Sequence, residues 1–125
     1  MKKTRYTSQF KLWKDFNFEA AHQLTMVPPG HQCGNLHGHS YKVRGHCKGV
    51  ISPKTEWVVD YAEIARATRP IIEELDHSFL NHILDLETTA ENLAWWISQK
   101  IVKKLPSLYA VEVFETPTTS VICEL

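Results

Sequence analysis

The stretch Cys33-Gly34-Asn35-Leu36-His37-Gly38-His39 places a thiol four residues before two alternating histidines. Because side chains two apart on a strand share a face, His37 and His39 are expected to point the same way and to bind one metal ion together. The alternation continues to Val50 and predicts a long strand. One face of that strand would carry His37, His39, Tyr41, Val43 and Cys47.

A third histidine ends an earlier alternating segment, Phe10 to His22. The apolar residues of this segment share parity with His22, so its imidazole is expected on the apolar face of a strand. Three histidines on two neighbouring strands fit a catalytic zinc site, in which three protein ligands leave one position open for substrate. A second reading stays open, in which Cys33 is a fourth ligand and closes a structural site.

Two capping-box patterns predict two helices after these strands. Asp60-Tyr61-Ala62-Glu63 begins the first, and apolar residues at helical spacing continue it to Leu75. Pro70 lies inside this segment and is expected to kink or divide the helix. Thr88-Thr89-Ala90-Glu91 begins the second helix, which Lys103-Lys104-Leu105-Pro106 is expected to end.

Two further strands are expected near the end of the chain, one with Val111, Val113 and Glu115 on a shared face and one from Ser120 to Leu125. The order ββααββ predicts an α+β fold, a four-stranded antiparallel sheet with two helices on one face. The length of 125 residues predicts a single domain, 1–125. Two helices cover only one side of the sheet, so we expect assembly into an oligomeric barrel.

Charge and cysteine content exclude several classes of partner. Lys and Arg number 14, Asp and Glu number 14, and the basic residues form no long block. We therefore expect no nucleic-acid partner and no membrane partner, since both need a concentrated positive face. No apolar segment resembles a signal peptide or a membrane span. The three dispersed cysteines form no disulfide framework and fit a reducing compartment, so the sequence predicts a cytoplasmic protein.

Three more residues are candidates for chemistry. Asp76 precedes His77, and a carboxylate beside an imidazole suits proton transfer near neutral pH. The alternative is that His77 only ends a helix, where the macrodipole favours it. Glu115 continues an apolar face, so it is expected to be partly buried and to need a hydrogen-bond partner or a ligand. A salt bridge to a neighbouring strand is the alternative for Glu115.

Taken together, five segments resemble the motifs of the 6-pyruvoyltetrahydropterin synthase superfamily, in the right order, over roughly residues 10 to 125. These segments are Phe18–His22, Cys33–His39, Leu75–Asn81, Thr89–Asn92 and Glu115–Thr116. The spacing between Cys33 and His37 resembles the branch that forms 6-carboxy-5,6,7,8-tetrahydropterin in queuosine biosynthesis. The chain departs from the family at Glu56, where Gly is common, and at Thr88, where Pro is frequent.

The resemblance implies the tunnelling fold, a homohexamer of two stacked trimers, and active sites between subunits. It implies a zinc-dependent lyase that converts 7,8-dihydroneopterin triphosphate to 6-carboxy-5,6,7,8-tetrahydropterin and releases triphosphate and acetaldehyde. It also assigns roles to residues: His22, His37 and His39 bind zinc, Cys33 is the general base, Asp76 and His77 form a proton relay, and Glu115, aided by Thr116, anchors the pterin.

Two other functions stay open. One is an enzyme on the same scaffold that forms 6-pyruvoyltetrahydropterin from the same substrate and no acetaldehyde. The other is a non-catalytic zinc- or pterin-binding module, in which Cys33 only closes the metal site.

Overall fold

The computed structural model describes residues 3–125. Two long strands, β1 (Phe10–His22) and β2 (His37–Gly49), pair antiparallel along their whole length. In this register Phe10 faces Gly49 at one end of the ladder and His22 faces His37 at the other. The predicted alternation is confirmed, because the even residues of β1 from Phe16 onward and the odd residues of β2 from Tyr41 to Cys47 are buried.

The remaining elements follow in the order α1 (Tyr61–Leu75), β3 (Ser78–Phe79), α2 (Ala90–Ile101), β4 (Leu108–Thr116) and β5 (Thr119–Glu124). Single 3-10 turns lie at Gln32–Gly34 and Leu80–His82. Within residues 3–125 the sheet has five strands in the order β3-β1-β2-β4-β5. β3 runs parallel to β1, whereas the other pairs are antiparallel.

The prediction of four antiparallel strands was therefore wrong in one respect. The missed strand, β3, has only two residues, which is too short for any alternation to be visible in the sequence. It forms because the chain leaving α1 runs alongside the end of β1, where Ala20 and Ala21 pair with Ser78 and Phe79.

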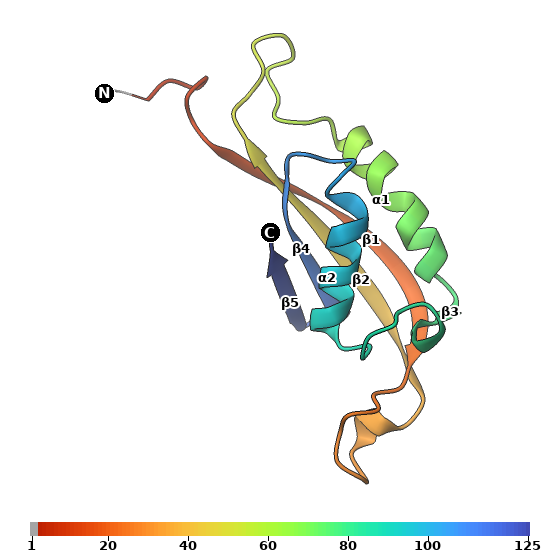
Figure 1. Cartoon of the computed structure of the whole chain (residues 1–125). Helices are drawn as coiled ribbons and strands as arrows, with labels where there is room; N and C mark the ends of the chain where they lie inside the picture. The colour runs from red at the N-terminus through yellow and green to blue at the C-terminus, as the bar shows by residue number, and fades with distance from the viewer. Residues whose placement is uncertain (1–2) are drawn as a thin grey trace.

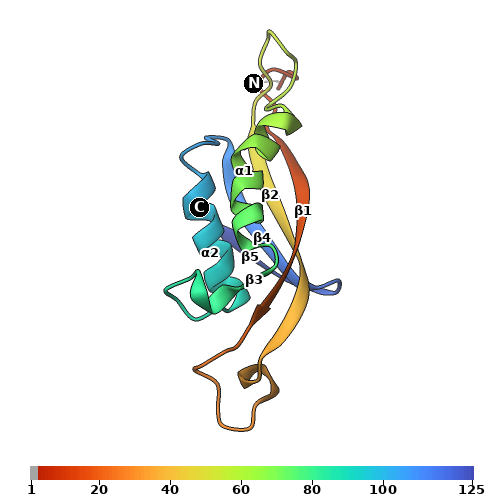
Figure 2. The same ribbon diagram turned by 90° about the vertical axis from the view of Figure 1, so that its right-hand side faces the viewer.

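Both helices cover the same face of the sheet (Figures 1 and 2). The core lies between these layers, where buried side chains of α1 and α2 form one cluster with those of β1, β2 and β4. Its largest fully buried apolar side chains are Tyr41, Phe18, Ile64, Leu75, Leu80, Leu93, Ile97, Ile101 and Leu105. The segment 23–36 extends beyond the helices at the end of the β1–β2 hairpin (Figures 1 and 2). Assembly into a barrel and the single-domain boundaries stay predictions.

The helix signals were correct in position and differ in detail. Asp60 caps α1, and its carboxylate accepts a hydrogen bond from the N–H of Ala62 at 2.9 Å. α1 continues through Pro70, which is exposed, so the proline does not divide the helix. The cap of α2 is Thr89, whose hydroxyl accepts from the N–H of Asn92 at 3.2 Å. Thr88 is fully buried and bonded to a histidine instead.

In residues 3–125 no helix is both long enough and apolar enough to span a membrane.

Glu56 has a left-handed backbone, with φ of 63°, in the turn between β2 and α1. This geometry explains why a glycine would be favoured there, since a Cβ costs about 1–2 kcal/mol in this conformation. The carboxylate of Glu56 accepts two exposed hydrogen bonds, from Tyr6 Oη at 2.9 Å and from Arg5 Nη2 at 3.3 Å.

We predict that Glu56→Gly is more stable than Glu56→Ala by about 0.5–1 kcal/mol, after the greater freedom of glycine in the unfolded chain is subtracted. Both substitutions remove the same carboxylate, so their difference isolates the backbone term. Urea unfolding of the two variants measures it. An alanine variant as stable as the glycine variant would contradict the left-handed geometry.

Candidate active site and metal centre

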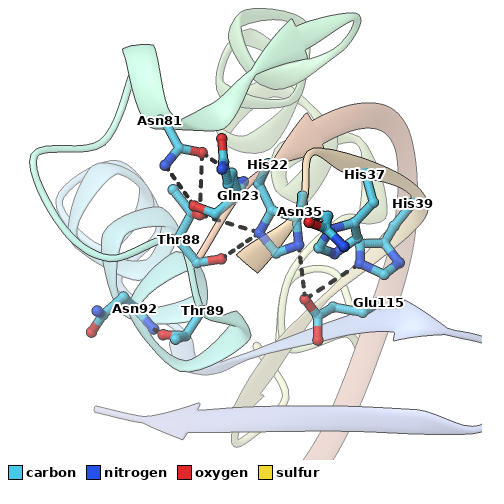
Figure 3. Close-up of polar contacts among 10 residues, drawn as sticks. All are labelled: His22, Gln23, Asn35, His37, His39, Asn81, Thr88, Thr89, Asn92 and Glu115. Carbon is cyan, nitrogen blue, oxygen red and sulfur yellow. Dashed lines mark hydrogen bonds and ion pairs between the residues drawn. The ribbon is translucent and has the colours of Figure 1, made fainter. Parts of the chain in front are cut away.

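Three histidines meet at the end of the β1–β2 hairpin, on the face that the helices cover. The strand register sets His22 opposite His37 and Ala20 opposite His39. The ring centroids of His22 and His37 are 4.6 Å apart, those of His22 and His39 5.1 Å, and those of His37 and His39 4.9 Å. One nitrogen from each ring lies within 4.8 Å of the others, which is close enough for the three to hold one metal ion (Figure 3).

Hydrogen bonds to the backbone orient two of the three rings. His22 Nδ1 lies 2.8 Å from the carbonyl oxygen of Thr88, and His37 Nδ1 lies 2.7 Å from that of Asn35. A carbonyl oxygen only accepts, so each Nδ1 carries the proton and each Nε2 keeps its lone pair. This arrangement is typical of metal-binding histidines, whose second nitrogen donates to a fixed acceptor.

The donor set fits a metal ion such as zinc. His22 is 1% exposed, and its Nε2 has no hydrogen-bond partner among the described residues. A buried polar atom without a partner costs about 1–3 kcal/mol, and a metal ion at this position would remove that cost. Burial also lowers the pKa of His22 and His39 below the usual value for histidine. Both imidazoles are therefore neutral near pH 7, the form that binds metals.

Glu115 and Cys33 lie beside the histidines. With the three histidines, and with Leu24 and Gln32, they line a pocket of about 340 Å³. Oε2 of Glu115 is 3.6 Å from His22 Nε2 and 3.8 Å from His39 Nε2, too far for hydrogen bonds, so the carboxylate adds negative charge near the centre. The predicted partial burial of Glu115 is confirmed, since its side chain is 31% exposed. Cys33 comes from the 3-10 turn between the two long strands.

Asp76 and His77 form the expected pair but do not line this pocket in the described part of the chain. Asp76 Oδ2 lies 3.0 Å from His77 Nδ1, and Asp76 Oδ1 accepts from the N–H of Glu19 at 2.9 Å. The Glu19 N–H and the neighbouring His77 lower the pKa of Asp76. The His77 side chain is 80% exposed. The two residues follow the end of α1 at the edge of the sheet, next to Glu19, whose side chain faces outward. Within one copy of the chain they therefore lie outside the pocket.

Thr116 is also outside the pocket that the described residues form. It follows Glu115 on β4, where the β4–β5 pairing shifts register between Phe114 and Thr116, so regular side-chain alternation does not continue through this position. Its hydroxyl is 2.6 Å from that of Thr119 at the β4–β5 turn.

Sequence reasoning missed the residues that support the histidines. Thr88 holds the ring of His22 with its carbonyl oxygen at 2.8 Å and its hydroxyl at 3.2 Å. Asn81 and Gln23 bond to each other close by (Figure 3). The only signals in the sequence were a threonine that precedes the helix cap by one residue and an asparagine that ends the Leu75–Asn81 motif.

Comparison with known proteins identifies the family. The family model described as 6-pyruvoyl tetrahydropterin synthase matches residues 11–125. The chain is 37% identical to the 6-carboxy-5,6,7,8-tetrahydropterin synthase of Synechocystis sp. over 118 residues, which cover 87% of this chain and 88% of the relative. It is 37% identical to the dihydroneopterin monophosphate aldolase of Pyrococcus furiosus over 90 residues, which cover 72% and 73% of the two chains.

The fold agrees with this assignment. The structure of Caenorhabditis elegans 6-pyruvoyl tetrahydropterin synthase superposes with a TM-score of 0.86, covering 94% of this chain and 96% of that one at 22% identity. The match of the family model to residues 11–125 shows that the chain belongs to the 6-pyruvoyl tetrahydropterin synthase family. It is an enzyme of the lyase-type pterin synthase class, and the predicted resemblance is confirmed.

We predict that His22→Ala lowers zinc affinity by more than the roughly 10–100-fold loss typical of changes around, rather than within, a ligand set. The reason is that His22 supplies a buried nitrogen already aimed at the centre. Competition with a chromophoric zinc chelator measures the affinity. His82→Ala is the control, because His82 is an exposed histidine outside the cluster. Equal affinities in the two variants would exclude a metal centre at the three histidines.

Proposed function

We propose that this enzyme carries out the zinc-dependent conversion of 7,8-dihydroneopterin triphosphate to 6-carboxy-5,6,7,8-tetrahydropterin, with release of triphosphate and acetaldehyde. The product would enter queuosine biosynthesis in the cytoplasm. The observation that carries the proposal is one pocket that contains three metal-binding imidazoles, a thiol and a carboxylate. The relatives named as 6-carboxy-5,6,7,8-tetrahydropterin synthases support the choice of product.

In this proposal His22, His37 and His39 hold the zinc ion. When bound, zinc supplies Lewis-acid chemistry that makes nearby hydroxyl groups of a substrate side chain more acidic. Cys33 acts as the general base that removes a carbon-bound proton. A thiol near a cationic centre has a lowered pKa, which raises its thiolate fraction at neutral pH.

Glu115 is proposed to anchor the pterin ring. Its carboxylate lies at the pocket wall, 31% exposed, and can accept hydrogen bonds from the ring amide and amino groups. Bonds of this charge-assisted kind contribute about 1.5–3 kcal/mol each. Thr116 does not line the pocket, so any help that it gives would be through its backbone or through a neighbouring copy of the chain.

Asp76 and His77 are proposed to relay protons in the pocket of a neighbouring copy, in a homohexamer with active sites between subunits. Two observations support this. The His77 side chain is 80% exposed, and its ring is held by Asp76 at 3.0 Å. His77 also has a left-handed backbone, with φ of 58°, directly after the Asp76 cap of α1. Glycine is the usual residue at that position, so a histidine there costs stability that a function would explain.

The first test is product analysis with the zinc-loaded protein and 7,8-dihydroneopterin triphosphate. We predict 6-carboxy-5,6,7,8-tetrahydropterin and acetaldehyde in equal molar amounts, measured by mass spectrometry and a coupled dehydrogenase assay. A 6-pyruvoyl product without acetaldehyde would support the sister activity. Binding of zinc and pterin without turnover would support the non-catalytic module. Faster turnover of the monophosphate than of the triphosphate would favour an activity like that of the Pyrococcus furiosus relative.

The second test asks whether two copies build each site. Cys33→Ala and His77→Gly are each expected to be inactive alone, although glycine suits the left-handed backbone at position 77. Co-expressed in equal amounts, they are predicted to recover about a quarter of wild-type activity, because half of the copies supply the thiol and half supply the imidazole at random. Folded mixed oligomers without recovered activity would show that the two groups do not act across a subunit boundary.

A further inference from the structure

Gln23, the residue after His22, makes side-chain amide hydrogen bonds in two directions. Its backbone bonds to the amide of Asn81, and its own amide bonds to the turn that carries Cys33. Asn81 Nδ2 donates to the carbonyl oxygen of Gln23 at 2.8 Å, and Asn81 Oδ1 accepts from the Gln23 N–H at 3.0 Å (Figure 3). β3 has ended at Phe79 by this point, so the amide of Asn81 takes the place of a peptide group and continues the pairing along the edge of β1.

On its other side, the same segment holds the turn that carries Cys33. Gln23 Nε2 donates to the carbonyl oxygen of Gly34 at 2.8 Å. The next residue, Leu24, donates its N–H to the carbonyl oxygen of Cys33 at 3.0 Å. The two consecutive carbonyls of Cys33 and Gly34 are therefore bonded to the two residues that follow His22.

Asn81 also contacts Thr88, whose oxygen atoms orient the ring of His22. Thr88 Oγ1 donates to Asn81 Oδ1 at 3.4 Å, and Thr88 accepts the Nδ1 proton of His22. Within the described residues, Asn81 and Gln23 thus link a zinc-ligand histidine to the backbone of the proposed base. The link does not pass through the β2 histidines, which are fixed separately by the strand register.

Cys33 needs such a link because it lies in a long connection. Residues 23–36 join the two strands, and most of them are exposed. The local bonds of the 3-10 turn, from Gly34 N–H to His31 and from Asn35 N–H to Gln32, shape the turn but do not place it relative to the histidines. A misplacement of about 1 Å between reacting groups can cost 10²-fold in rate.

We propose that Gln23 and Asn81 are positioning residues that fix Cys33 relative to the three histidines. This inference rests on the proposed function, in which Cys33 is the base. It assigns a task to Asn81, the last residue of the Leu75–Asn81 motif, and to Gln23, and neither residue lines the pocket of the three histidines.

The test uses Gln23→Met, which keeps the length of the side chain and removes the donor to Gly34. At saturating zinc we expect kcat to fall about 10–100-fold, the usual effect of losing a supporting contact, while KM for the pterin changes much less. Gln23→Lys, whose ammonium can donate to the same carbonyl, is expected to restore part of the rate. Gln99→Met, an exposed glutamine on α2, is the control for the substitution itself.

Coupling between the two residues is tested by Asn81→Ala alone and with Gln23→Met. Because both act on the same backbone segment, the double variant is expected to lose little more than Asn81→Ala alone. Asn92→Ala controls for lost stability, since its amide also donates to a backbone carbonyl, that of Glu87 at 2.9 Å. Normal kcat in both single variants, or an equal loss in Asn92→Ala, would overturn the inference.

A second readout does not depend on pterin turnover. The rate at which iodoacetamide alkylates Cys33 in the zinc-loaded protein is measured at one fixed pH by peptide mass spectrometry. We expect this rate to change several-fold in Gln23→Met, because the thiol loses its fixed place in the pocket, and to stay unchanged in Gln99→Met. An unchanged rate in Gln23→Met would overturn the positioning role. If Gln23→Met changes this rate but the wild-type protein shows no lyase activity, the proposed reaction fails and the positioning role stands.

Discussion

The register between β1 and β2 is the constraint on which the site depends. Side chains alternate along a strand, so a slip of one residue would move His37 and His39 to the opposite face from His22. The register is held by the core that the same strands build, in which Phe18 stacks on Tyr41 with ring centroids 4.8 Å apart. The apolar packing that stabilises the fold therefore also brings the three histidines close enough together to hold a metal ion.

The helical layer contributes the second part of the site. The chain entering α2 places the carbonyl of Thr88 on the ring of His22, which fixes the tautomer and leaves Nε2 facing the other histidines. Burial lowers the pKa of His22 and His39 and so favours their neutral form. The strands therefore bring the three rings together, and the loop before α2 orients the ring of His22.

The candidate catalytic residues lie in two separate places on one copy of the chain, an arrangement that would suit an active site built from two copies. Cys33 and Glu115 line the pocket with the histidines, whereas Asp76 and His77 form a hydrogen-bonding pair at the sheet edge, with 3.0 Å between His77 Nδ1 and Asp76 Oδ2. The strained backbone of His77 favours a role that needs an imidazole at that position. Both halves would be used if the pocket of one copy faced the edge of another.

Much of this could be predicted from the sequence, and the part that could not has a common cause. The alternation of β1 and β2 and the facing of the three histidines are periodic features, which a single sequence displays. β3 and the amide contacts of Asn81 and Gln23 are not periodic, because they join segments about sixty residues apart through side chain–backbone bonds. The cap of α2 was misplaced by one residue for the same reason, since Thr88 is committed to His22.

The central claim is that the three histidines form an open metal site with Cys33 left free as a base. Zinc K-edge X-ray absorption of the zinc-loaded protein, with and without a pterin product analogue, tests it most directly. We expect three imidazole nitrogens at about 2.0–2.1 Å and no sulfur ligand. A zinc–sulfur distance of about 2.3 Å that persists with the analogue bound would contradict it, because Cys33 would then close the site as a structural ligand.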